Sequence, residues 1–217
     1  MSLGSWGVVF APLWVLWGSP ISVGEVLASA LGLGMVICNF AVNPMSWPLA
    51  IASSALYALL FLDSRLYGEA SLQLVFIAMA LWGWAQWRRG RGLAGNAPLR
   101  VHSLGKRGRL WVLGLTLAAW PLLGLLLSRV TDSDVPYLDA LPTVGSITGT
   151  LLLGRKLVEN WPVWIAVNIV SIGLFAGKGL WLTVALYAVF AVLAVVGWRA
   201  WAAIMAAQPA AASTTRR

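Results

Sequence analysis

Two tryptophans and an asparagine stand at helical spacing in the apolar segment that begins near residue 161. Trp161, Trp164 and Asn168 follow an i, i+3, i+7 pattern, so a helix would present them on one face. An indole offers a flat stacking surface and is the best ring for holding a cation over its face. The Asn168 amide can both donate and accept hydrogen bonds. The set suits a flat, cationic ring that carries hydroxyl or carboxamide groups.

Other polar side chains fall inside apolar segments, where such groups tend to face the interior of a helix bundle. Thr143, Ser146 and Thr150 form a stripe of hydroxyls at the same helical spacing. The remaining candidates are single positions, namely Asn39, Ser53, Ser54, Tyr57, Gln73 and Tyr187. Each could line a substrate path or could equally hold helices together. Trp161 could likewise belong to an interfacial aromatic belt, and we interpret Trp82, Trp84 and Trp87 in that way.

The elements that would carry these residues are membrane-spanning helices. Of the 217 residues, 60% are hydrophobic and 10% are charged, against roughly 25% charged in a soluble domain. A span needs about 20 largely apolar residues, and seven segments qualify. These are 22–42, 46–62, 67–87, 110–128, 138–154, 161–177 and 180–203. The sequence lacks the alternation of a barrel, so we predict an all-α polytopic membrane protein.

Residues outside these seven segments add little chemistry. The apolar stretch 6–17 is short and contains Pro12, so we interpret it as an interfacial or partial helix rather than an eighth span. A single cysteine, Cys38, cannot form an internal disulfide. The single histidine, His102, lies in a basic loop and is interpreted as a solvated residue. We therefore predict no metal site, no cofactor and no catalytic residue.

Basic residues are concentrated in the connection 88–109, which holds seven of them. If this loop is cytoplasmic, twelve basic residues lie inside and three, Arg65, Arg129 and Lys178, lie outside. The positive-inside rule then predicts an amino terminus outside and a carboxyl terminus inside the inner membrane of a bacterium. The net charge of +8 is thus a topology signal with attraction to anionic lipid, and it does not indicate nucleic-acid binding.

The chain repeats itself at an offset of 114 residues, as between Trp47 and Trp161. Fourteen of the 41 positions from 47 to 87 are identical to their counterparts, without a gap. We predict one membrane domain over 1–217 with a three-helix repeat at 22–87, a linker helix at 110–128 and a second repeat at 136–203. Three spans in the first repeat would leave the second repeat inverted in the membrane. The linker helix adds a fourth span and restores the orientation, so the repeats are parallel. Parallel repeats of this kind occur in SWEET transporters, where substrate binds near the midplane.

Several of these segments resemble a known family. RKLVENWPVWIAVNIVSIGLFAGKGLW, SRLYGEASLQLVF and LWGWAQW are similar to the PnuC family of vitamin transporters, and the resemblance extends from about residue 22 to 203. It implies a three-plus-one-plus-three fold, a homotrimer, and facilitated uptake of nicotinamide riboside with trapping by a cytoplasmic kinase. Riboside carriers often have glutamine where this chain has Thr150 and asparagine where it has Ala80, which makes thiamine or another flat vitamin the second hypothesis.

The sequence lacks the features that would couple transport to an energy source. It contains no GxxxxGK[ST] motif for holding phosphates, and no acidic residue lies in the middle of a predicted span. We therefore predict a uniporter. A membrane receptor or an assembly subunit is the alternative from another class, and a membrane-embedded enzyme has only Glu159 or the pair Asp132 and Asp134 as acidic groups.

Overall fold

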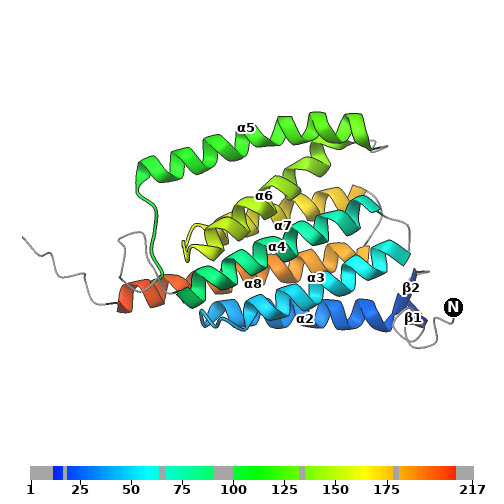
Figure 1. Cartoon of the computed structure of the whole chain (residues 1–217), viewed down its shortest axis with the longest axis horizontal. Coiled ribbons are helices and arrows are strands. Elements are labelled where there is room, and N and C mark those ends of the chain that lie inside the picture. The colour runs from blue at the N-terminus through cyan, green and yellow to red at the C-terminus, as the bar shows by residue number, and fades with distance from the viewer. Residues whose placement is uncertain are drawn as a thin grey trace, which may run out of the picture. The chain divides into compact units, whose positions relative to one another are not determined.

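The computed structural model describes residues 12–16, 19–63, 67–89, 100–131, 135–177 and 181–208. This part of the chain forms seven helices and a two-stranded hairpin (Figure 1). The helices are α2 (Val23–Phe40), α3 (Ser46–Asp63), α4 (Tyr67–Arg89), α5 (Lys106–Val130), α6 (Pro136–Gly154), α7 (Asn160–Gly177) and α8 (Trp181–Ala207). Each lies within a few residues of a predicted span. As predicted, every regular element in the described residues from Val23 onward is therefore a helix.

The amino-terminal segment departs from the prediction. β1 (Pro12–Leu16) pairs antiparallel with β2 (Ser19–Ser22), with Val15 opposite Pro20. The expected partial helix is therefore wrong for residues 12–16, while residues 6–11 and 17 lie outside the described residues. Pro12 explains part of the difference, because proline is tolerated at the first residue of a strand but interrupts a helix.

A capping box starts α2. The Ser22 hydroxyl accepts from the backbone N–H of Glu25 at 3.2 Å, and the Glu25 carboxylate accepts from the Ser22 N–H at 2.8 Å. These bonds satisfy two donors that have no partner within the helix. Glu25 therefore has a structural role at the start of α2.

The chain divides into two compact units, and α6 belongs partly to each. Unit 1 holds 1–99 with 146–155, and unit 2 holds 100–145 with 156–217. In unit 1, α2, α3 and α4 pack in chain order, and the end of α6 packs on α4, where Trp82 occupies the space left by Gly154. In unit 2, α7 packs on α8, and Val167 of α7 lies against Gly145 of α6.

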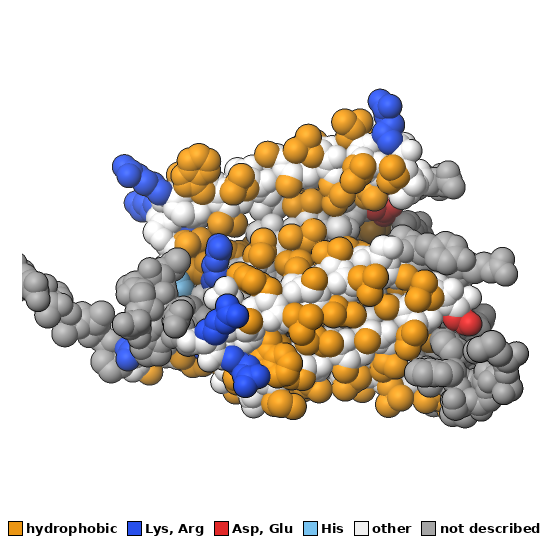
Figure 2. All heavy atoms as spheres, in the orientation of Figure 1, with side chains coloured by type: hydrophobic (Ala, Val, Ile, Leu, Met, Phe, Trp, Pro, Cys, Tyr) orange, Lys and Arg blue, Asp and Glu red, His pale blue; other side chains and the backbone are white. Residues whose placement is uncertain are grey.

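Five helices in the described residues are long and apolar enough to cross a membrane, namely α2, α3, α5, α7 and α8. α4 and α6 are as long but less apolar, since α4 carries Gln73 and Gln86 and α6 carries Asp139 and several hydroxyls. Their crossing of the membrane stays a prediction. Large apolar side chains cover the helix surfaces while arginines and lysines gather at helix ends (Figure 2). On α5, Trp111 is 72% exposed, as expected of a lipid-facing helix.

Candidate functional site

Trp161 fastens α7 to α8. Its side chain is only 3% exposed and meets Trp201 edge to face, with ring centroids 5.6 Å apart and planes at 86°. A Cβ at Gly197 would collide with the Trp161 ring, so glycine at this position lets the indole pack closely against α8. Packing of this kind contributes more than the buried area alone. Contact of Trp161 with a substrate stays a prediction.

The same arrangement occurs in unit 1 at residues numbered lower by 114. Trp47 of α3 is 3% exposed and lies on Gly83 of α4, where a Cβ would collide with its ring. It meets Trp87 edge to face at 5.4 Å and 89°. We call these two arrangements the tryptophan clamps. Trp87 is itself 5% exposed and donates to the Leu153 carbonyl at 3.2 Å, so placing it in an interfacial belt was wrong.

Beyond the clamp, α7 presents a polar face. Trp164 is half-buried and Asn168 is 4% exposed. An amide can both donate and accept hydrogen bonds, which suits Asn168 to a bound hydroxyl or carboxamide. Ser171, one turn further along, is 1% exposed. Sequence reasoning missed Ser171, although extending the stripe by one turn would have found it.

Tyr187 and Gln73 occupy equivalent positions in α8 and α4, in different units. Tyr187 is half-buried and contacts two phenylalanines, Phe175 of α7 at 5.2 Å and Phe190 at 6.3 Å between centroids. It thus completes an aromatic patch beside α7. Gln73 is half-buried on α4. A substrate role for either residue stays a prediction.

Two of the four candidates on α2 and α3 join these two helices. The Tyr57 hydroxyl lies 2.9 Å from the Ser29 hydroxyl, and the Ser53 hydroxyl donates to the Ala28 carbonyl at 2.8 Å. The structure thus accounts for Tyr57 and Ser53 as helix-joining residues. Ser54 is half-buried and Asn39 is 4% exposed.

The hydroxyl stripe of α6 bonds to its own helix. Thr143 donates to the Asp139 carbonyl at 3.1 Å, and Thr150 donates to the Ser146 carbonyl at 2.8 Å. Such back-bonding uses the hydroxyl proton and leaves only acceptor capacity for a ligand. Thr143 belongs to unit 2, whereas Ser146 and Thr150 belong to unit 1. Their role in a substrate path stays a prediction.

The candidates are divided between the two units. Unit 2 contains Trp161, Trp164, Asn168 and Tyr187, and unit 1 contains Asn39, Ser54, Tyr57, Gln73, Ser146 and Thr150. No group of three or more His, Cys, Asp or Glu residues that could hold a metal ion is found in the part of the chain that the structure describes.

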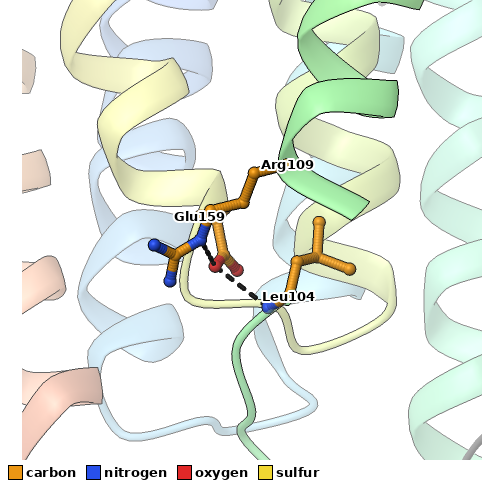
Figure 3. A network of polar contacts seen from close by, with 3 residues as sticks. All are labelled: Leu104, Arg109 and Glu159. Carbon is orange, nitrogen blue, oxygen red and sulfur yellow. Dashed lines mark hydrogen bonds and ion pairs between the residues drawn. The ribbon is translucent and has the colours of Figure 1, made fainter. Parts of the chain in front are cut away.

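A polar network that sequence reasoning missed lies at the start of α7 (Figure 3). One oxygen of the Glu159 carboxylate accepts from the Leu104 N–H at 3.0 Å and from Arg109 Nε at 2.9 Å. The backbone of His102 pairs with that of Leu157 in a parallel bridge. His102 was predicted to be a solvated loop residue, but its backbone is paired and its side chain is half-buried. We call Val101–Arg109 together with Lys156–Glu159 the α5–α7 strap.

Comparison with known proteins decides the family. The profile described as "Nicotinamide mononucleotide transporter" matches residues 22–203. The chain belongs to this family. This is the PnuC family, which the sequence motifs already resembled. Family members are transporters rather than enzymes, and the chain is accordingly a multi-pass protein of the bacterial inner membrane.

Characterised relatives carry different vitamins. The chain is 27% identical to the riboflavin/roseoflavin transporter RibM of Streptomyces davaonensis, over 86% of this chain and 88% of that one. It is 25% identical to the nicotinamide riboside transporter PnuC of Escherichia coli, over 67% and 71%. For PnuC of Neisseria mucosa the values are 29% identity over 69% and 59%.

One solved structure shares the fold of this chain. The crystal structure of the vitamin B3 transporter PnuC superposes with a TM-score of 0.68 and covers 85% of this chain and 82% of its own. The two sequences are 23% identical, so the likeness concerns the fold alone. It agrees with the helical architecture described above.

Proposed function

We propose that this chain mediates facilitated uptake of a flat, ring-bearing B vitamin, with nicotinamide riboside as the first candidate. The observation that carries the proposal is the α7 face on which half-buried Trp164 adjoins the buried Asn168 amide. In this proposal the Trp164 indole stacks on the cationic ring. The Asn168 amide binds a ribose hydroxyl or the carboxamide, and Ser171 supplies a further hydroxyl.

The carrier is proposed to consist of two parallel triplets, α2–α4 and α6–α8, joined by α5. Three features at the 114-residue offset support this. α3 and α7 have the same length, the tryptophan clamps match, and Val42 and Lys156 share a left-handed backbone, with φ of 54° and 53°. The amino terminus is proposed to lie outside and the carboxyl terminus inside, because the basic residues cluster at one set of helix ends.

Uniport with metabolic trapping is the proposed mechanism. Among the helices, acidic residues stand at the ends or in the first turn, as Glu25, Asp63 and Asp139 do, which leaves no intramembrane carboxylate for coupling to protons or sodium. Net uptake would then follow the substrate gradient, maintained by a cytoplasmic kinase. A homotrimer is proposed for the assembly, and other polar candidates, among them Gln73, Thr150 and Tyr187, would complete the substrate path.

Riboflavin is the second candidate substrate. Its support is the relative RibM, whose similarity extends over 86% of this chain. An isoalloxazine ring is flat and carries a polyhydroxylated chain, so the same stacking and amide groups would serve it. Thiamine, a flat cation with a hydroxyl tail, remains the third.

Uptake into proteoliposomes tests the proposal. Purified protein should accumulate labelled nicotinamide riboside to equilibrium without any ion gradient, and an uncoupler should have no effect. Parallel assays with riboflavin and thiamine rank the three substrates. Strict dependence on a proton or sodium gradient would exclude uniport, and binding without flux would favour a receptor or a subunit.

Matched variants test the site. Trp164→Ala and Asn168→Ala should each weaken binding of the best substrate about tenfold or more, since stacking on an aromatic ring and a buried hydrogen bond each contribute about 1–3 kcal/mol. Trp111→Ala is the control, because this indole is 72% exposed on α5. Unchanged affinity in both site variants would disprove the assignment.

A further inference from the structure

A single carboxylate oxygen joins the start of α5 to the start of α7. Glu159 directly precedes α7, Leu104 precedes α5, and Arg109 lies in the first turn of α5. The Glu159 side chain is 16% exposed, whereas Arg109 is 58% exposed. The bond from the Leu104 N–H is therefore the more sheltered of the two, and the exposed ion pair adds less because water screens it.

Backbone pairing and apolar burial reinforce this junction. The His102 N–H donates to the Lys156 carbonyl at 3.1 Å, and the Val158 N–H donates to the His102 carbonyl at 3.0 Å. Around this bridge, Val101, Leu157 and Val158 are 3%, 2% and 7% exposed. Opening the strap would thus expose apolar surface and leave several backbone groups without partners.

The second half of α5 is attached separately, to the start of α6. Trp120 Nε1 donates to the Tyr137 carbonyl at 2.6 Å. The Tyr137 ring lies on Gly124, where a Cβ would collide with it. α5 therefore has one attachment at its start and one in its second half, and both lie within unit 2.

We propose that Glu159 is a positioning residue that holds α5 and α7 as one rigid body throughout the transport cycle. This inference rests on the proposed carrier function, because α7 bears the proposed substrate face. The linker helix then moves with the second triplet, and the strap stays closed in every state. Loss of Glu159 slows turnover while leaving the substrate face able to bind.

Transport kinetics give the first test. Glu159→Ala should lower the maximal uptake rate about tenfold, as expected from loss of one charge-assisted hydrogen bond, while the dissociation constant for substrate in detergent stays within about twofold. Arg109→Gln should have a smaller effect in the same sense. Arg107→Gln is the control, because Arg107 lies in the same helical turn, is exposed and carries the same charge. A wild-type rate in Glu159→Ala, or an equal loss in Arg107→Gln, would overturn the proposal.

A disulfide gives the second test and separates a permanent strap from a gate. Paired strand residues have Cα atoms about 4.8 Å apart, within the range that a disulfide spans, so His102→Cys and Leu157→Cys should cross-link. Cys38→Ser provides the background. The oxidised protein should transport as fast as the same protein after reduction. Transport that stops on oxidation and returns on reduction would show that the strap opens in each cycle, and would overturn the proposal.

A measurement without substrate separates failure of this inference from failure of the proposed function. Spin labels at Leu117 of α5 and Ile169 of α7, which are 52% and 58% exposed, report the distance between the two helices by double electron–electron resonance. One narrow distance is expected, and it should broaden in Glu159→Ala but not in Arg107→Gln. A distribution that Glu159→Ala leaves unchanged would refute the strap, even if no vitamin is carried. If the wild type transports none of the vitamins while this pattern holds, only the proposed function fails.

Discussion

The turn between α2 and α3 and the turn between α6 and α7 reverse the chain in the same way. Val42 in the first and Lys156 in the second have φ of 54° and 53°, and each turn delivers a tryptophan into a clamp. The turns differ in the residue directly before the next helix. Met45 is 54% exposed in the first turn, whereas Glu159 is largely buried and accepts two hydrogen bonds in the second.

This difference shows which parts of a repeated turn are fixed and which can specialise. Backbone conformation and the tryptophan clamp are common to both copies and set the course of the chain. The side chain directly before the helix, at position 45 or 159, takes no part in the clamp, so it can have a different function in each copy. Methionine cannot accept strong hydrogen bonds, and only the second copy can therefore hold the segment that leads into α5.

The largest expected effect concerns the tryptophan clamps, which the two copies share. Gly83→Val and Gly197→Val should each destabilise the protein by about 3 kcal/mol, because the added side chain collides with a buried indole. Thermal unfolding in detergent measures the loss. Gly173→Val is the control, since a Cβ there meets no atom within 4 Å. A large loss at only one of the two clamps would contradict their equivalence.

The next largest effect concerns the residue directly before α3 or α7, in which the two copies differ. Glu159→Ala should cost about 2 kcal/mol, because it leaves the Leu104 N–H without its acceptor. Glu159→Gln should cost less, since an amide oxygen can still accept that bond. Met45→Ala, at an exposed site, should stay within about 0.5 kcal/mol. Similar losses of stability at positions 45 and 159 in the same thermal assay would contradict this difference between the two turns.

A smaller effect is expected from the left-handed residues. Val42→Asn should stabilise the protein by about 1 kcal/mol, because a β-branched residue is strained at positive φ and asparagine tolerates it. Lys156→Asn should stabilise it less, since lysine is not β-branched. Equilibrium unfolding in detergent compares the two variants. Destabilisation by Val42→Asn would show that its side-chain contacts outweigh backbone strain.

The smallest effect concerns pH. Burial lowers the pKa of Lys156 from its usual value of 10.5. Between the lowered pKa and 10.5 the unfolded chain binds more protons than the folded one, so the contribution of Lys156 to stability rises with pH in that window. Below the lowered pKa the full cost of burying the charge remains. Lys156→Met should reduce this rise in a series of melting temperatures, and Val42→Met should not. An equal pH profile for wild type and Lys156→Met would contradict burial as the cause.

Hydropathy and spacing predicted the helices well, because a long apolar run in this class of protein can satisfy its backbone only as a helix. Hydropathy reveals less about what a side chain faces, since lipid tails and a protein interior are equally apolar. For this reason the sequence placed Trp87 in an interfacial belt, although it is buried against α6. The packing of Trp161 on Gly197 was hidden for the same reason.

The polar face of α7 followed from local spacing, except for Ser171. The strap could not be found in that way. Glu159 and Leu104 are 55 residues apart in sequence and stand in irregular segments without a period. One of the two donors is a backbone N–H, which every residue except proline carries. Only the folded chain shows which backbone group a carboxylate will meet.

The α5–α7 strap also orders events during synthesis. The segment 101–109 leaves the ribosome before Glu159 exists, because the rest of α5 and all of α6 are synthesised in between. Until then the amide of Leu104 and the guanidinium of Arg109 can be satisfied only by water, lipid phosphate or an assisting protein. Closure of the strap therefore marks the moment at which the newly made start of α7 captures a helix that was synthesised before it.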